Sequence, residues 1–463
     1  MHTRLAVCTV ALLIAAALRI LGISVQSLRG DEAFAARYWT LPLAELTAPS
    51  GLAWREPHPF GAFIAFGAWR TLAGEREVAL RMLPALVNLL GAAAVYATAR
   101  RLFRSKHATQ AGIWALLLWA CNPYLIWHSQ DVRNYALWSG VSALALYLLI
   151  RATDRRTWYD WTLYTLAEIV ALYLFFLESF ILALHALYVL MVKRRALRAW
   201  LVAFCAILAA HIPSFVQGAA LAQSGYGGTR GSADLALLPN FWTVLLLGEL
   251  SAPTFGAAVL ILLLFSALLL PTNLRLYFIL SLSLPLLALY LVATRLNVFD
   301  PRYILAALPF GTLILARMAS QVRLPFSVLI GVAMIGVQLA ALAPYRAESY
   351  QKAPNWRGWA AFLHQHTAAG DTLIITPADP ASGATDPAIA YYYAQPARVL
   401  VLPYPNADTE SFVREALLTS RAVWFTPTGS EGREVLAALE RHGILQGKFD
   451  VAQNFRVWRF AKR

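Results

Sequence analysis

The sequence predicts an all-α polytopic membrane domain of about eleven transmembrane helices, residues 1–344, followed by a small extracytoplasmic α/β domain, residues 345–463. Three observations lead to this fold class. Hydrophobic residues form 59% of the 463 residues and charged residues only 14%, a balance too apolar for a soluble protein of this length. The apolar runs are about 17–22 residues long and do not alternate as barrel strands do. Beyond residue 344 the composition becomes mixed.

Each predicted span is an apolar run suited to cross a bilayer as a helix, which satisfies its own backbone hydrogen bonds in hydrocarbon. The first run follows Arg4 and resembles a signal peptide, but no small-residue cleavage site follows it, so we expect it to be retained. The expected spans lie near residues 5–25, 82–99, 109–127, 135–150, 161–177, 179–192, 199–216, 255–270, 275–294, 303–319 and 326–344.

The short loops predict the orientation, because Lys and Arg are held on the cytoplasmic side. Every second loop is basic, and these loops lie at residues 100–106, 151–156, 193–198, 275 and 317–323. The N-terminus is therefore expected in the cytoplasm and the C-terminal domain outside. The net charge of +14 largely reflects this pattern, so it gives no reason to expect a nucleic-acid partner.

The last part of the chain has the pattern of a small α/β domain. Residues 356–366 have a helical pattern that ends before Gly370, and the apolar run 372–376 then reads as a strand. Strand patterns recur at residues 398–402, 422–426 and 455–460, with helical patterns between them.

The long first outer loop, residues 26–81, carries two groups of chemical interest. Asp31 and Glu32 follow the first span directly, and carboxylates near hydrocarbon are costly enough that they usually have a function. The alternative is interfacial solvation of a loop. Glu56 and His58 occupy a turn bounded by prolines, whose alternative role is only to break a helix. Their position after Asp31 and Glu32 predicts a shared cleft.

Two later junctions on the same predicted side are also rich in polar residues. The first, residues 122–135, contains Asp131 and Arg133, which could simply pair with each other. The second contains Asp300 and Arg302 at the start of a span, where an arginine often anchors the helix end. Because these residues share a side with Asp31, a functional interpretation stands beside the structural one at both junctions, and both stay open here.

Five elements in order resemble one family over almost the whole chain. They are residues 30–34, 56–59, 122–135, 300–309 and 355–371, and together they resemble bacterial family 39-like glycosyltransferases of the polytopic C-type superfamily, alongside protein O-mannosyltransferases and lipid A aminoarabinose transferases. The resemblance implies a protein of the bacterial inner membrane. It also implies inverting transfer from a polyprenyl-phosphate sugar donor to an envelope lipid, glycan or protein acceptor on the outer face.

On that pattern Asp31 is the candidate general base, since an acceptor hydroxyl needs a carboxylate to remove its proton as it attacks. Glu32 would orient Asp31, raise its pKa by proximity or bind a divalent cation, the one cofactor left open. Arg133 and Arg302 would neutralise the leaving phosphate. The weaker phosphate candidates are His58 and His128, and the supporting residues are Asp131, Glu56, Tyr135 and Tyr303, with Asp131 holding Arg133.

One position departs from the family, and two other functions stay open. Glu178 stands where many relatives have a histidine near the outer end of the fifth span. A transporter of lipid-linked sugars would carry charges at mid-depth and often two similar halves, but no repeat is visible and the acids cluster at one face. A polysaccharide polymerase or ligase would instead use a diphosphate-linked glycan.

Overall fold

The computed structural model describes residues 2–48, 51, 54, 56–103, 107–228, 231–378, 384–393, 397–401, 408–427, 432–452 and 455–463. The chain forms two compact units. The first contains Met1–Ile23 and Tyr38–Tyr350, and the second contains Ser24–Arg37 and Gln351–Arg463. The predicted first outer loop is thus divided between the units. These two units are defined by packing alone. They do not test the predicted domain division at residue 344, which stays a prediction.

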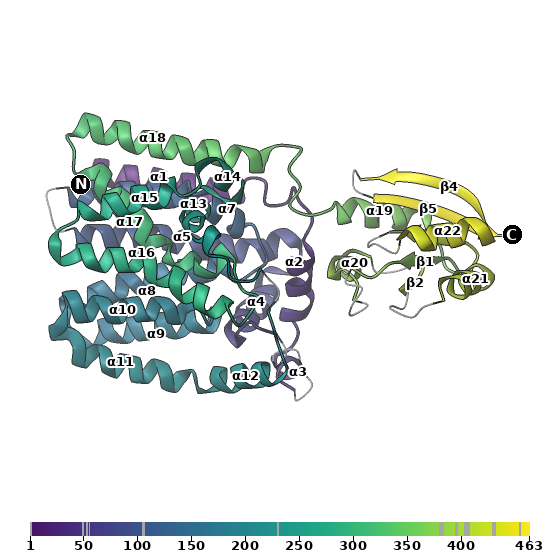
Figure 1. Cartoon of the computed structure of the whole chain (residues 1–463), viewed down its shortest axis with the longest axis horizontal. Helices are drawn as coiled ribbons and strands as arrows, with labels where there is room; N and C mark the ends of the chain where they lie inside the picture. The colour runs from purple at the N-terminus through teal and green to yellow at the C-terminus, as the bar shows by residue number, and fades with distance from the viewer. Residues whose placement is uncertain are drawn as a thin grey trace. The chain divides into compact units, whose positions relative to one another are not determined.

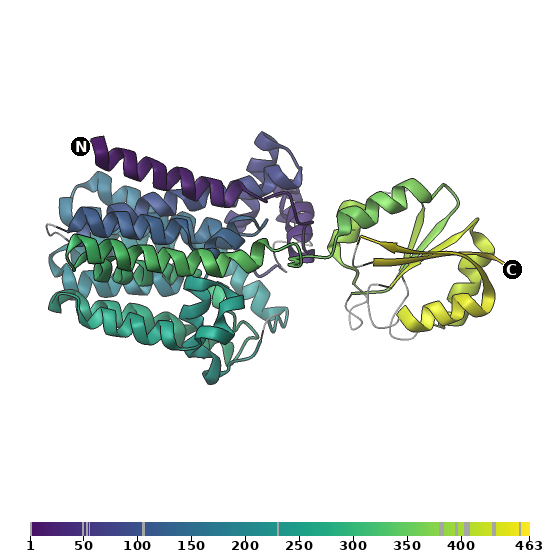
Figure 2. The ribbon, with the colours of Figure 1, turned by 90° about the horizontal axis from the view of Figure 1, so that it is seen from above.

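The first unit is helical, and Figures 1 and 2 show its long helices lying side by side. Helix α5 packs against both α6 and α8, and α8 packs against α9. The helices are α1 (His2–Ile20), α3 (Leu43–Leu46), α4 (Phe60–Ala73), α5 (Glu77–Leu102), α6 (Ala108–Ala120), α7 (Pro123–Ser129), α8 (Tyr135–Arg155), α9 (Trp158–Leu174), α10 (Glu178–Val192), α11 (Leu197–Ala210), α12 (Ile212–Gln223), α13 (Phe241–Leu247), α14 (Ala252–Phe255), α15 (Ala258–Leu268), α16 (Thr272–Ala293), α17 (Leu308–Ser320) and α18 (Leu324–Leu342). Shorter helical turns of this unit are η3 (Arg194–Ala196), η4 (Leu235–Asn240), η5 (Glu249–Ser251), η6 (Pro301–Ala307) and η7 (Ala343–Arg346). The turn η1 (Ala35–Trp39) begins in the second unit and ends in the first.

Every predicted span coincides with helix, but not every helix is long. Among the described residues, five helices are long and apolar enough to cross a membrane, and two bent pairs raise that number to seven. The other apolar helices, such as α10 with 15 residues, are shorter than the roughly 20 residues that a full crossing needs. The structure therefore fits a multi-pass membrane protein, while the predicted count of about eleven is not confirmed.

Two of the predicted spans are each divided by a bend in the structure. The run 199–216 divides into α11 and α12, which meet at 53° around His211. Pro213 in the first turn of α12 explains the break, because proline lacks an N–H to continue the preceding helix. The run 255–270 has an 81° bend before α15, at Gly256, whose φ of 49° suits glycine.

A third break separates α6 from α7. Asn122 lies between them, and its side chain accepts a hydrogen bond from Leu125 N at 2.8 Å. Pro123 takes the first position of α7, where a missing N–H has no cost. The predicted span 109–127 therefore ends early, and α7 leads into the polar segment that contains His128 and Arg133.

The second unit is built on a five-stranded mixed sheet in the order β2-β1-β3-β5-β4. Strand β1 is parallel to β2 and β3, whereas β5 is antiparallel to β3 and β4. The α/β prediction is therefore confirmed. The elements are α2 (Gly30–Phe34), α19 (Trp356–His366), β1 (Thr372–Ile375), α20 (Pro387–Tyr392), β2 (Arg398–Val401), α21 (Thr409–Thr419), β3 (Val423–Thr426), α22 (Gly432–His442), β4 (Gly443–Val451) and β5 (Phe455–Lys462).

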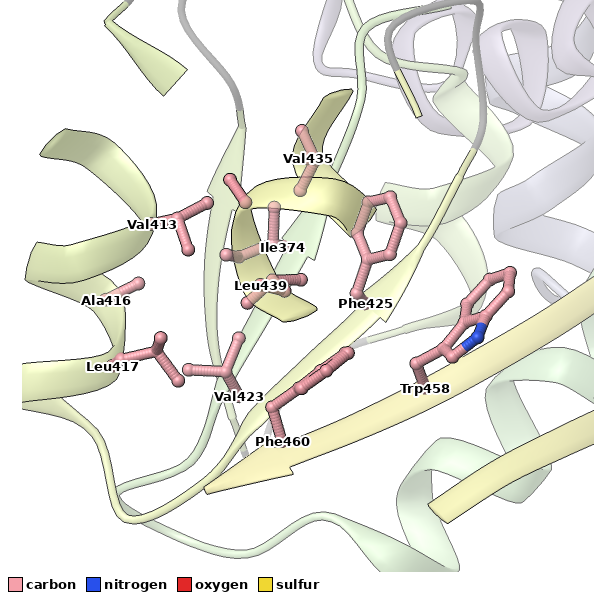
Figure 3. Packing of buried hydrophobic residues seen from close by; sticks show 11 residues of the cluster. Ile374, Val413, Ala416, Leu417, Val423, Phe425, Val435, Leu439, Trp458 and Phe460 are labelled. Carbon is pink, nitrogen blue, oxygen red and sulfur yellow. The ribbon is translucent and has the colours of Figure 1, made fainter. Parts of the chain in front are cut away.

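The core of this unit lies between the sheet and the helices α21 and α22 (Figure 3). Phe425 of β3 and Phe460 of β5 are fully buried against side chains of α21 and α22 such as Val413 and Leu439. Trp424, the neighbour of Phe425, lies near Phe362 of α19, at 6.3 Å between ring centroids. Neighbouring residues of β3 thus contact different helices, because successive side chains of a strand point to opposite faces of the sheet.

Candidate active site

Three polar side chains of the first unit, Glu56, His58 and Arg133, contact one another in series. Glu56 Oε1 is 2.5 Å from His58 Nδ1, and His58 Nε2 is 3.0 Å from an Arg133 guanidinium nitrogen. Because a guanidinium can only donate, His58 Nε2 accepts and the ring proton sits on Nδ1, toward Glu56. Gln217 of α12 donates to the His58 carbonyl at 2.8 Å and so fixes the turn. These contacts use both His58 ring nitrogens, which favours a role in orienting Arg133 over direct phosphate binding.

The ring of Trp39 packs against two of these three side chains, Arg133 and His58. The Arg133 guanidinium lies 4.5 Å from the Trp39 ring centroid, and the rings of Trp39 and His58 are 4.8 Å apart. Arg133 is 7% exposed, so the attraction between cation and ring acts in a largely desolvated place. Nothing in the sequence around Trp39 signals a distant arginine, so this contact could not be predicted.

Arg302 is held in a similar way at the start of η6. Its guanidinium is 2.9 Å from an Asp300 carboxylate oxygen, and the other Asp300 oxygen accepts the Arg302 backbone N–H at 3.0 Å. The guanidinium also lies 5.7 Å from the Tyr135 ring centroid. Asp300 therefore fixes both the backbone and the side chain of Arg302. The sequence places Asp300 beside Arg302 but predicts no such role for it.

Phe175, between α9 and α10, joins the two arginine groups. Its ring centroid is 6.2 Å from His58, 5.7 Å from Tyr135 and 5.7 Å from Tyr303. Trp138 contacts Phe175 on another side, at 4.8 Å, and donates to Glu178 at 2.5 Å. The sequence does not mark Phe175, because it lies in an apolar run between Leu174 and Phe176.

His128 and Asp131 have surroundings that suit packing more than ligand binding. His128 is 1% exposed, and its ring lies 4.5 Å from Tyr124 and 4.7 Å from Trp127. Asp131 is fully buried, and its carbonyl accepts the Arg133 backbone N–H at 2.7 Å. Asp131 thus shapes the turn that presents Arg133, a backbone route that the sequence had not specified.

Asp31 and Glu32 belong to the second unit, in α2. Glu32 is buried, and its carboxylate accepts the Arg29 backbone N–H at 3.1 Å, so it caps its own helix. The acid that faces α2 from elsewhere is Asp386, whose carboxylate lies 3.1 Å from where a Cβ on Gly30 would stand. Burial, and then the charge of Asp31, raise the pKa of Asp386. The structure therefore gives Asp31 a carboxylate neighbour that the sequence did not predict.

The divalent cation that the sequence left open stays a prediction. Within the described part of the chain, no three His, Cys, Asp or Glu side chains gather as a metal site, whereas Mg²⁺ and Ca²⁺ take six or more oxygen ligands. Glu32, the predicted ion ligand, is turned to the Arg29 N–H.

Asp386 provides a stability prediction with a defined sign. Because its pKa is raised, the folded state holds the proton more tightly than the unfolded state. Stability therefore falls as the pH rises from the ordinary carboxyl pKa of about 4 to the raised folded value, and the loss persists at neutral pH. Asp386→Asn keeps an oxygen to accept from Ala388 N, a 2.8 Å bond. We expect this variant to be more stable than the wild type at pH 7 and to differ less at pH 4.

Hydrogen exchange at the β1 and β3 amides, corrected for its intrinsic pH dependence, measures this effect in the full chain. Asp408→Asn is the matched control. Asp408 caps α21 through Ser411, whose hydrogen bond lowers the Asp408 pKa, so its stabilising contribution is present at neutral pH and is lost as the pH falls. The two variants should shift in opposite directions at pH 7. A shift of both in one direction would refute the electrostatic explanation.

Comparisons with known proteins place this geometry in a family context. A family model described as dolichyl-phosphate-mannose-protein mannosyltransferase matches residues 57–216. The structure is similar to apo ArnT from Cupriavidus metallidurans, with a TM-score of 0.66 and 12% identity over 97% of each chain. ArnT bound to undecaprenyl phosphate gives a TM-score of 0.63, also at 12% identity and 97% of each chain. No curated protein matches the sequence.

A second group of similar structures is archaeal. The Archaeoglobus fulgidus oligosaccharyltransferase in complex with Zn and sulfate aligns with a TM-score of 0.56 and 16% identity, over 96% of this chain and 73% of that chain. The chain has the C-type glycosyltransferase fold. The resemblance that the sequence motifs indicated is thereby confirmed. In this glycosyltransferase fold the matched family segment contains His58, Arg133 and Phe175, whereas Asp31 and Arg302 lie outside it.

Proposed function

We propose that this protein is an inverting glycosyltransferase that moves a sugar from a polyprenyl-phosphate donor to a cell-envelope lipid, glycan or protein. The observation that carries the proposal is the cluster in which Arg133 and Arg302, both largely buried, lie on aromatic rings linked through Phe175. Its support is the fold shared with ArnT, which has been solved with undecaprenyl phosphate.

The two arginines suit a phosphate leaving group. As the bond between the sugar C1 and the phosphate oxygen breaks, its electron pair stays on the phosphate, which gains negative charge. A guanidinium offers paired N–H donors to such oxygens, and fixed donors act strongly where water is excluded. Glu56, His58 and Asp300 hold the two guanidinium groups in place, so little reorganisation is needed when that charge develops.

Asp31 is the proposed base. The acceptor hydroxyl oxygen would attack C1 from the face opposite the phosphate, which inverts the configuration, while its proton passes to the Asp31 carboxylate. Glu32 caps α2 and would thereby position Asp31, one residue away. Polyprenyl phosphate and the glycosylated acceptor leave, and the proton on Asp31 returns to solvent.

The proposal extends to location. The apolar helices and the alternating basic loops support a multi-pass protein of the bacterial inner membrane, with about eleven spans by the length that a crossing needs. The N-terminus would be cytoplasmic. The active site and residues 345–463 would be on the extracytoplasmic side, where lipid-linked sugars are used.

Donor discrimination tests this function directly. Purified protein in lipid nanodiscs is given hexosyl or pentosyl polyprenyl monophosphates, or a diphosphate-linked glycan, with extracted envelope lipids and glycans as acceptors. We expect transfer from a monophosphate donor, detected by mass spectrometry, with and without EDTA. Transfer only from the diphosphate donor would indicate a polymerase or ligase. Movement of intact donor across a vesicle membrane without transfer would indicate a transporter.

A further inference from the structure

A second polar site lies far from the arginine and aromatic cluster. A cavity of about 350 Å³ opens among the ends of five helices of the first unit, and its lining includes Arg101, Asp154, Lys193, Asn273 and Arg317. Tyr135 of the cluster begins α8, and Asp154 lies in the last turn of the same helix. Nineteen residues of helix separate them, roughly 28 Å at 1.5 Å per residue, so the cavity is not part of the proposed active site.

The charges around this cavity favour an anion. Three basic side chains line it and one acid opposes them, and the acid, Asp154, is already bound to Lys193 at 2.9 Å. Arg317 lies 5.5 Å from the Phe103 ring centroid, and Arg101 lies 5.7 Å from that of Tyr147. Rings against the guanidinium faces hold both arginines beside the cavity, and a guanidinium donates its hydrogen bonds along its edges.

The start of α16 adds a second, independent attraction for an anion. Pro271 precedes this helix of 22 residues, and both Pro271 and Asn273 line the cavity. In the described structure no side chain caps the first turn of α16, and that turn contains no acid. The N–H groups of a helix start and the positive end of its dipole attract phosphate. The dipole of α16 and the two arginines therefore attract an anion to the same cavity.

We propose that this cavity binds a phosphate group, supplied by an anionic phospholipid headgroup or by free phosphate. The cavity belongs to the end of the bundle that carries Arg101, Lys193 and Arg317, in the basic loops predicted to be cytoplasmic. Basic pockets between membrane helices on that side suit lipid phosphates. A bound headgroup would hold together the ends of α5, α8, α10, α16 and α17.

Lipid-binding measurements on the full chain test this site. Native mass spectrometry gives the apparent affinity for phosphatidylglycerol, with phosphatidylcholine as the neutral comparison and inorganic phosphate as competitor. We expect Arg317→Gln and Arg101→Gln each to weaken phosphatidylglycerol binding roughly fivefold, the usual effect of one basic residue. Arg317→Lys keeps the charge and should lose less. Arg323→Gln, an exposed residue outside the cavity, should bind as the wild type does.

The outcomes separate the two sources of phosphate. Competition by millimolar inorganic phosphate would show that the free anion occupies the site, and binding that only the lipid shows would identify the headgroup. Melting temperatures in detergent without lipid check that the variants fold. The proposal fails if Arg317→Gln retains wild-type affinity, if Arg323→Gln loses as much as Arg317→Gln, or if neither phosphatidylglycerol nor phosphate binds.

Discussion

Asp31→Asn should lower the single-turnover rate of sugar transfer about 10²–10⁴-fold, which is the usual contribution of a positioned general base. Asparagine keeps the size of the side chain and most of its hydrogen bonding but cannot accept a proton. Asp31 lies in the first turn of α2, whose cap comes from Glu32 rather than from Asp31, so the variant should fold. Donor binding, measured in parallel with a labelled polyprenyl phosphate, should change little.

Glu32→Gln is the matched control for this experiment. Its amide oxygen can still accept the Arg29 N–H that Glu32 accepts at 3.1 Å, so α2 keeps its cap and transfer should fall much less than in Asp31→Asn. A larger loss in Glu32→Gln would make Glu32 the base or an ion ligand. Normal transfer by Asp31→Asn would remove Asp31 as the base and overturn the central mechanistic proposal.

Local patterns in the sequence predicted much of the fold. The apolar runs found helices, and the strand patterns at residues 372–376 and 422–426 correspond to β1 and β3. Strand β4 was missed because its residues are mostly exposed and Gly447 lies at an irregularity in its pairing with β5. Lipid and core burial select for apolar residues, so apolar runs reveal those elements. The run of β4 is instead interrupted by Gln446, Lys448 and Asp450, and it carries no such signal.

The candidate site was predicted only in part, because its contacts join distant segments. Six of the predicted residues do come together with Phe175 in the first unit, and these are Glu56, His58, Arg133, Arg302, Tyr135 and Tyr303. Polar residues at the starts of helices are visible in a sequence. Trp39 and Phe175 look like ordinary apolar residues until the fold places a guanidinium or an imidazole against them. Asp386 reads as a helix cap before proline, and the effect of Asp31 on the Asp386 pKa arises only from the packing of α2 with α20.

Arg302→Ala should lower the transfer rate about 10²–10³-fold, the loss seen when one donor to a developing anion is removed. The guanidinium would contact the phosphate most strongly as the C1–O bond breaks, so the transfer rate should fall more than donor affinity. Arg302→Lys should restore only part of the rate, because an ammonium is a point charge without the paired donors of arginine. Single-turnover transfer and donor binding in nanodiscs measure the two effects separately.

The pairing of Asp300 with Arg302 affects how this test is interpreted. Removal of Arg302 alone leaves Asp300, which pairs with it at 2.9 Å, as a charge without that partner, and breaking such a buried pair costs about 3–5 kcal/mol of stability. The double variant Asp300→Asn/Arg302→Ala removes both charges, so its stability should recover. If Arg302 stabilises the leaving phosphate, transfer by the double variant stays low although the protein is stable. If transfer recovers together with stability, Arg302 serves only to neutralise Asp300, and Arg133 alone remains as the phosphate-binding arginine.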